Sequence, residues 1–150
     1  MERYEGENLG AVKGILLIAL GDITIPPGTV LLFSAITVAS GKSWTEVPFT
    51  PESGFYSDSR KKSKAGDFYE KEVKFSIPKV RNEISEEISQ LSGKRLAGLV
   101  TDMNDETRLV YPLRIEYSAE VPAQAAGYNG YYFDLRGQNT TESPTVTMPE

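Results

Sequence analysis

The sequence contains no histidine and no cysteine among its 150 residues. Histidine is the commonest general base and metal ligand, and its ordinary pKa lies closest to neutrality. Without these two residues the chain cannot form a Ser-His-Asp or Cys-His catalytic site, a histidine- or thiolate-ligated zinc centre, a thiol redox site or a disulfide. Catalysis would have to use carboxylate, lysine, tyrosine or serine side chains, so the composition favours a binding or structural role.

Long apolar runs and excess positive charge are also lacking. The longest apolar run, Ile15–Leu20, is far shorter than the roughly 20 residues of a membrane helix, so no membrane partner is expected. The net charge of -5 argues against nucleic acid or an anionic lipid surface as the main partner. With 39% hydrophobic residues, we expect residues 1–150 to form one domain with a small core.

Most of the sequence has the pattern of short β-strands separated by turn residues. The clearest strand alternates, with Tyr69, Val73, Phe75 and Ile77 on one face and polar residues on the other. Six strands are predicted, at residues 9–20, 30–38, 68–77, 96–101, 109–117 and 130–136.

A hairpin is predicted around residues 102–106, where Asn and Asp tolerate the backbone conformations of a turn. Pro112 cannot donate to a β-ladder, so its strand should be an edge strand or carry a bulge. The residues expected on one side of this strand are Leu109, Tyr111, Leu113, Ile115 and Tyr117, and those on one side of the last strand are Tyr131, Phe133 and Leu135.

One short helix is predicted after residue 81. Asn82 is a candidate N-cap, Ile84, Ile88 and Leu91 recur at helical spacing, and Gly93 supplies a stop. A helix of this length is stable in water only when its apolar stripe packs on other elements. We therefore predict a mainly β fold, a β-sandwich or barrel of six to eight strands with one short α-helix packed on it.

Two polar segments do not fit this order. Residues 50–66 are longer than an ordinary hairpin loop and residues 137–150 are rich in threonine, so we predict an extended loop and an extended C-terminal tail. The loop is basic and the helix is acidic. The simpler interpretation is that the charged side chains of the loop are exposed to water. The alternative is that the loop of one copy pairs with the acidic helix of another, which would fix the orientation of the two copies. The predicted interface residues are Arg60, Lys61, Lys62 and Lys64 in the loop and Glu83, Glu86 and Glu87 on the helix.

Aromatic side chains gather near residue 130. Tyr128, Tyr131 and Tyr132 have large apolar rings with a polar tip, which suits a subunit contact. Ordinary packing inside a sandwich explains the same cluster equally well.

Three short motifs resemble catalytic or ligand sites but lack required residues. Ala39–Ser43 lacks the first glycine and the following helix of a phosphate-binding loop. Residues 102–106 begin like a calcium loop, but Thr107 and Leu113 occupy the positions that need Gly and Glu. Ser59–Lys62 has the serine-lysine spacing of acylating enzymes without the buried helix start that this chemistry needs. We therefore expect no catalytic residue, no metal and no cofactor, and a protein that is not an enzyme.

The stretch Glu72–Lys79, the short acidic helix, residues 96–104 and 107–110, and Gly127–Tyr131 resemble small virion proteins from the tail and neck regions of tailed bacteriophages. This resemblance implies a structural protein with a tail-tube-like β-sandwich or barrel, a flanking helix, and a loop that overlaps the next subunit in a ring, often a hexamer. It also implies other virion proteins as partners, DNA passing through a lumen without sequence specificity, and a location in the virion after synthesis in the host cytoplasm. Tail tube, tail terminator and neck component all remain open.

Two functions follow as hypotheses. The first is a virion structural subunit that forms homo-oligomers through sheet edges, the basic loop and the tail. The alternative is a β-sandwich module that binds a glycan or a peptide on a platform of Tyr128, Tyr131, Tyr132 and Trp44.

Overall fold

The structure is a computed structural model that describes residues 10–149. Most of its strands pair in antiparallel fashion. The predicted mainly β class with one short helix is confirmed. Six strands have seven or more residues, and five strands of two or three residues bring the total within the described range to eleven. The strands are β1 (Val12–Ala19), β2 (Ile23–Thr24), β3 (Val30–Leu32), β4 (Thr37–Val38), β5 (Thr45–Glu46), β6 (Phe55–Ser63), β7 (Gly66–Pro78), β8 (Leu96–Asp102), β9 (Thr107–Glu120), β10 (Gly130–Asn139) and β11 (Thr145–Thr147). The helix is α1 (Asn82–Leu91), and η1 (Leu20–Asp22) and η2 (Phe33–Ala35) are 3-10 turns.

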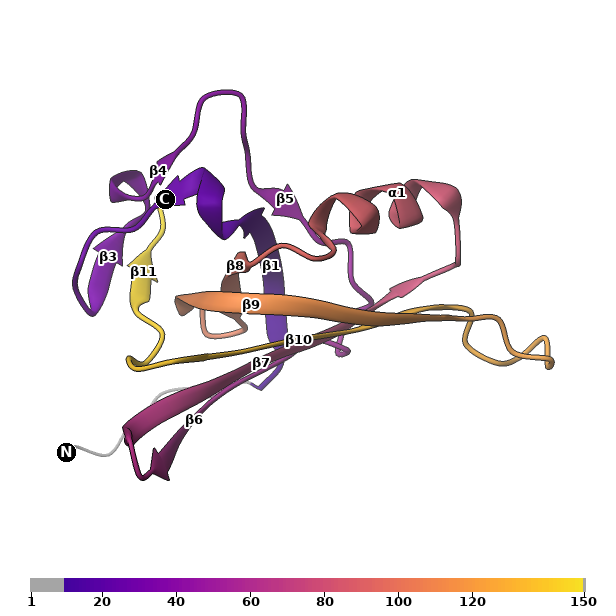
Figure 1. Cartoon of the computed structure of the whole chain (residues 1–150). Helices are drawn as coiled ribbons and strands as arrows, with labels where there is room; N and C mark the ends of the chain where they lie inside the picture. The colour runs from indigo at the N-terminus through magenta and orange to yellow at the C-terminus, as the bar shows by residue number, and fades with distance from the viewer. Residues whose placement is uncertain (1–9, 150) are drawn as a thin grey trace.

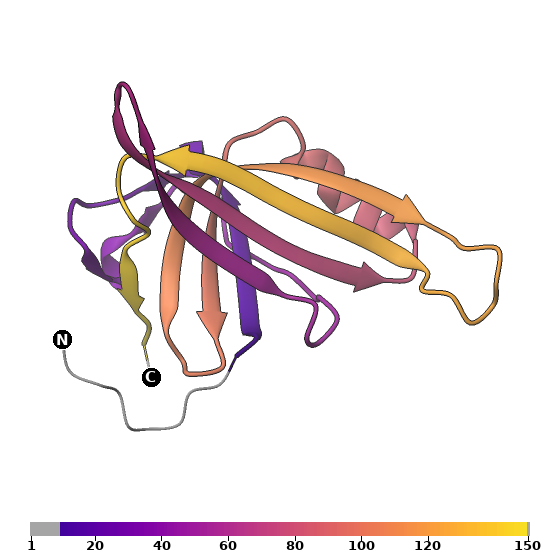
Figure 2. The same ribbon diagram turned by 90° about the horizontal axis from the view of Figure 1, so that it is seen from below.

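The strands of the main sheet follow the order β5-β1-β8-β9-β10-β7-β6, and β2 and β4 form a separate pair. Strand β9 joins two limbs of this sheet, because its first half pairs with β8 and its second half with β10. The limb with β1 and β8 runs at a steep angle to the limb with β10, β7 and β6 (Figures 1 and 2). The large apolar core lies between the two limbs and contains residues from both.

The pairing of β9 with β8 is irregular around Pro112. Leu96 of β8 lies opposite Leu113, whereas Gly98 lies opposite Val110, so β9 carries an extra residue there. The predicted bulge is confirmed. The edge alternative is wrong, because β9 has neighbours on both sides.

The bulge also reverses which residues of β9 face the large core. Before it Val110 faces this core, and after it Leu113 does so, while Leu109 and Tyr111 face a second apolar cluster. The prediction that Leu109, Tyr111 and Leu113 share one face is therefore wrong. Side chains alternate between the two faces of a strand, so one inserted residue moves every later side chain to the other face.

Helix α1 covers one end of the large core, where Ile84 and Ile88 are buried. Gly93 follows the helix with a φ of 78°, as expected for a glycine stop. The cap residue is Arg81 rather than Asn82, which is the first helical residue and donates from Nδ2 to Glu86 Oε1 at 3.0 Å. No helix within residues 10–149 is both long and apolar enough to cross a bilayer.

The two segments expected to be irregular are ordered by pairing. Within residues 50–66, β6 pairs with β7 from Phe55 opposite Lys74 to Ser63 opposite Gly66, so the prediction of a loop is wrong. Hydrogen bonding to the long β7 strand outweighs the weak strand propensity of serine and lysine. The predicted tail is wrong as well: β10 continues to Asn139, and β11 pairs with β3 and β9.

The predicted strand at residues 30–38 is interrupted. The turn η2 separates β3 from β4, which pairs with β2. Leu31 points into the second apolar cluster, whereas Val30 and Leu32 lie on the opposite, exposed side of β3.

Candidate functional site

The basic cluster lies at the tip of the β6–β7 hairpin, at one end of the molecule (Figure 2). Lys61 and Lys62 are exposed on β6, Lys64 lies in the turn, and Arg60 forms an ion pair with Asp67. Because β6 is an edge strand, these charges also discourage unwanted pairing with another sheet. The position is therefore compatible with either a contact site or a protected edge.

Glu83, Glu86 and Glu87 are all exposed on α1. Both views place α1 at the end of the molecule away from the basic hairpin tip (Figures 1 and 2). The two charged groups thus do not meet within one chain, and a pairing between them would need two copies.

Tyr131 belongs to the core, which corrects its placement on an interaction surface. Its side chain is 2% exposed, and its hydroxyl donates to the carbonyl oxygen of Arg81 at 2.9 Å and lies 2.6 Å from Ser85 Oγ. These bonds tie β10 to the start of α1. Tyr128 and Tyr132 remain exposed, with their ring centroids 5.5 Å apart.

Sequence reasoning missed the most prominent surface feature, the long projection formed by the ends of β9 and β10. We call residues 117–132 the β9–β10 arm. Gly130 and Tyr131 at its base are buried, its other residues are exposed, and the arm extends away from the core in both views (Figures 1 and 2). Its connecting loop, residues 121–129, contains no charged residue and is exposed throughout. Four of the large hydrophobic side chains that the structure leaves exposed lie on this arm: Tyr117, Val121, Tyr128 and Tyr132. The sequence offered only a weak signal for the arm, because a longer stretch without charge also occurs at residues 23–41.

The loop of the arm is fixed at its C-terminal end by the segment between β7 and α1, and within the loop by close packing. Asn129 accepts two backbone hydrogen bonds, from Lys79 N to its carbonyl oxygen at 2.7 Å and from Val80 N to its Oδ1 at 3.0 Å. Gly127 lies so close to Pro122 that a Cβ at this position would approach the proline ring to 2.6 Å. A loop ordered in this way loses little conformational entropy when it binds a partner.

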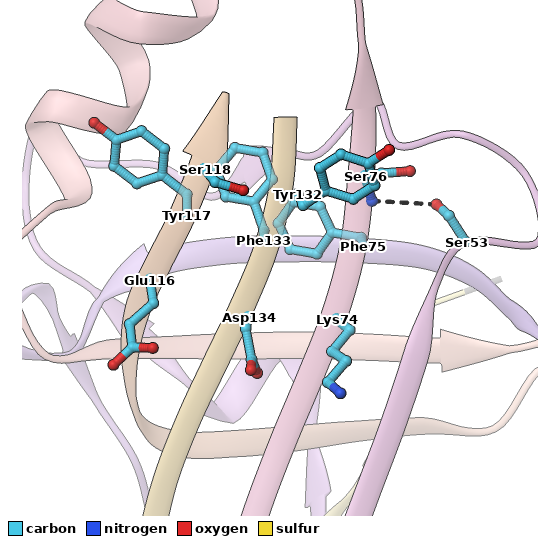
Figure 3. Close-up of a pocket in the computed structure, with 10 residues that line it drawn as sticks. All are labelled: Ser53, Lys74, Phe75, Ser76, Glu116, Tyr117, Ser118, Tyr132, Phe133 and Asp134. Carbon is cyan, nitrogen blue, oxygen red and sulfur yellow. Dashed lines mark hydrogen bonds between the residues drawn. The ribbon is translucent and has the colours of Figure 1, made fainter. Parts of the chain in front are cut away.

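A shallow groove of about 560 Å³ lies on the outer sheet face at the base of the arm (Figure 3). Asp134 lies between Lys74 and Glu116 in the strand register. Its Oδ2 accepts from Arg136 Nε at 2.9 Å, while its Oδ1 is buried without a hydrogen-bond partner in the described chain. Tyr132 lies between Ser76 and Ser118 in the next row.

The predicted aromatic platform does not exist as one surface. Tyr132 lines the groove and Tyr128 lies beside Tyr132, but Tyr131 is in the large core. Trp44 packs at the second apolar cluster, where its ring lies 6.5 Å from that of Phe33. The four side chains therefore cannot stack together on one sugar or peptide.

A buried ion pair links β6, β7 and the segment before β11. Lys71 Nζ lies 3.1 Å from Asp58 Oδ2, and the two side chains are 1% and 5% exposed. Lys71 Nζ also donates to Ser143 Oγ at 2.8 Å, and Ser143 N donates to Asp58 Oδ2 at 2.8 Å. The sequence already indicated that Lys71 is buried. It lies two residues from both Tyr69 and Val73, so it shares the apolar face of the strand with them.

The environment sets the ionisation of this cluster. Burial favours the neutral acid of Asp58, but the hydrogen bonds from Ser143 and Lys71 outweigh burial and hold its pKa below the ordinary value. Burial lowers the pKa of Lys71, against the attraction of Asp58. Burial also raises the pKa of Tyr56, whose hydroxyl donates to Asp58 Oδ2 at 3.2 Å, to about 12. The cluster anchors the C-terminal segment to the β6–β7 hairpin.

Within residues 10–149, no three acidic side chains are grouped so that they could hold a metal ion. No family model, curated protein or solved structure matches this chain.

Proposed function

We propose that this protein is a structural subunit that assembles with copies of itself into a ring, as a tail-tube-type or neck component of a bacteriophage virion. The observation that carries the proposal is the β9–β10 arm. It exposes Tyr117, Val121, Tyr128 and Tyr132 to water outside the core. Large apolar side chains left in water on one projection suit an interaction site, and burying one such side chain contributes roughly 1.5–3 kcal/mol.

The distribution of charge supports assembly between copies. The basic hairpin tip and the acidic helix lie at different ends of the molecule (Figures 1 and 2). Copies arranged head to tail can bring opposite charges together, which raises the rate of association and selects one orientation. Both ends of the strand order, β5 and β6, are free edges within the described chain and offer further contact sites.

The assignment to a bacteriophage virion rests on the resemblance of residues 72–136 to tail and neck proteins. Other virion proteins and DNA passing through a lumen are the partners that this assignment brings with it. Self-assembly itself rests on the arm and the charge distribution, so the two parts of the proposal can be tested separately.

Native mass spectrometry and negative-stain electron microscopy over a range of protein concentrations test self-assembly. The expected result is a closed oligomer with a single copy number, visible as rings. A monomer at high concentration, both alone and mixed with other virion proteins, would refute the proposal.

The groove at the base of the arm supports a second candidate, the binding of a glycan or peptide at Tyr132. An aromatic ring beside carboxylates and serine hydroxyls can stack on a sugar and bond its hydroxyl groups. Saccharides and short peptides should then shift the NMR signals of Tyr132 and Asp134. No shift at millimolar ligand would exclude this candidate.

A further inference from the structure

The most exposed large hydrophobic residues of the described chain lie at two separate places. Val121, in the loop of the β9–β10 arm, is 68% exposed, and Val30 and Leu32 of β3 are 68% and 58% exposed. We call Val30 and Leu32 the β3 ledge. These two side chains share one face of the strand, because they are two residues apart.

The β3 ledge is suited to receive another chain. Within residues 10–149, β3 pairs only with β11, so its other edge has free backbone donors and acceptors. The ledge also lies in a stretch, residues 23–41, that contains no charged residue. An uncharged apolar surface of this kind matches the uncharged loop of the arm, because neither side would have to bury an unpaired charge.

The two surfaces lie at opposite ends of the molecule. The arm points away from the core at one end, and β3 lies at the other in both views (Figures 1 and 2). One chain therefore cannot satisfy both surfaces by folding its own arm onto its own ledge. A second copy can.

We propose that the loop of the β9–β10 arm in one copy docks on the β3 ledge of a second copy. This inference rests on the proposed self-assembly and specifies which surfaces meet. The contact is heterologous, since different surfaces of the two copies are joined, and each added copy presents a new free ledge or a new free arm. Contacts of this type close into rings when the rotation between copies allows it.

Two single substitutions test the contact. Val121→Asp damages the arm and leaves the ledge intact, and Leu32→Asp damages the ledge and leaves the arm intact. Both residues are exposed, so the fold should survive, which circular dichroism checks. A carboxylate would have to be desolvated in the contact, so each variant alone should associate roughly 100-fold more weakly than the natural chain. Met103→Asp is the matched control, because Met103 is 44% exposed on the turn between β8 and β9, outside both surfaces.

Mixing the two variants gives the decisive result. The intact arm of Leu32→Asp should dock on the intact ledge of Val121→Asp, and the damaged surfaces should prevent further growth. With one variant isotopically labelled, native mass spectrometry should show a one-to-one heterodimer, while Met103→Asp assembles like the natural chain.

Other results would overturn the inference. If the natural chain assembles and either variant assembles equally well, the arm and ledge are not the contact, but the proposed function stands. If both variants are monomeric and their mixture also stays monomeric, the two surfaces do not meet each other. A natural chain that is monomeric at every concentration would refute both the inference and the proposed function.

Discussion

Replacing Lys71 by methionine should destabilise the protein strongly. The substitution keeps the length of the side chain but removes the ammonium group that lies 3.1 Å from Asp58 Oδ2. Asp58 would remain as a buried carboxylate that keeps hydrogen bonds from Ser143 and from the Tyr56 hydroxyl. Breaking one side of a buried ion pair costs about 3–5 kcal/mol, and the remaining hydrogen bonds place the expected loss near 3 kcal/mol.

Lys74 provides a matched control on the same strand. Its Nζ lies 3.1 Å from Glu72 Oε1, the same separation as in the buried pair, but the side chains of this pair are 47% and 23% exposed. Lys74→Met should therefore cost less than about 1 kcal/mol, because water screens exposed charges. The two variants differ in burial and not in the ion-pair distance.

Urea denaturation followed by circular dichroism measures the free energy of unfolding of each variant. The double variant Lys71→Met with Asp58→Leu removes both charges and should recover most of the loss, since a buried pair contributes little relative to apolar residues of similar size. A loss below 1 kcal/mol for Lys71→Met would refute this reasoning. So would a double variant as unstable as the sum of its single substitutions.

The pH dependence gives an independent check on Asp58. Its pKa in the folded protein lies below the ordinary 3.8, so the unfolded chain takes up a proton first as the pH falls. The stability that the carboxylate contributes is present above the unfolded pKa and is lost as the pH falls through the folded pKa. The double variant should lose this part of the acid sensitivity.

Three further changes test other parts of the structure. Lys61→Glu combined with Lys62→Glu should weaken assembly, more strongly at low salt because salt screens charge attraction, and sedimentation at two ionic strengths measures the effect. Tyr131→Phe removes the hydroxyl that ties β10 to α1 and should lower the free energy of unfolding by about 1–2 kcal/mol in urea denaturation. An unchanged value would contradict the stabilising role of this hydroxyl. The pKa of Tyr56 is about 12, so the unfolded chain loses this proton first and the stability of the fold decreases as the pH rises from 10 through 12. Thermal melting at alkaline pH should show a smaller decrease in stability for Tyr56→Phe.

Local patterns in the sequence identified the elements whose structure depends on near neighbours. The alternation around Val73 and Phe75 predicted the buried face of β7, and the spacing of Ile84 and Ile88 predicted the packed side of α1. Gly93 supplied the helix stop. In each case residues two to four positions apart share a face, so the pattern is readable without knowing the fold.

Patterns failed where pairing with distant segments decided the outcome. Residues 55–63 have few apolar side chains, yet they form a strand because β7 supplies the hydrogen-bonding partner. The single-face prediction for β9 failed because the bulge at Pro112 shifted the alternation by one residue. Of the tyrosines predicted at an interface, Tyr131 is buried. Tyr131 and Tyr132 point to opposite faces of β10, and the sequence does not indicate which of the two faces packs on the core.

The absence of histidine and cysteine, the strand-rich pattern and the single amphipathic helix were determined by the sequence alone. They restrict the chemistry of the chain and the class of its fold, because they depend on residue types and short spacings. Only the tertiary structure placed Lys71 opposite Asp58 and extended the ends of β9 and β10 beyond the core as an arm. It also set β3, which carries Val30 and Leu32, at the other end of the molecule from the β9–β10 arm. These features depend on contacts between residues far apart in the chain, whose positions are set by the register of the whole sheet.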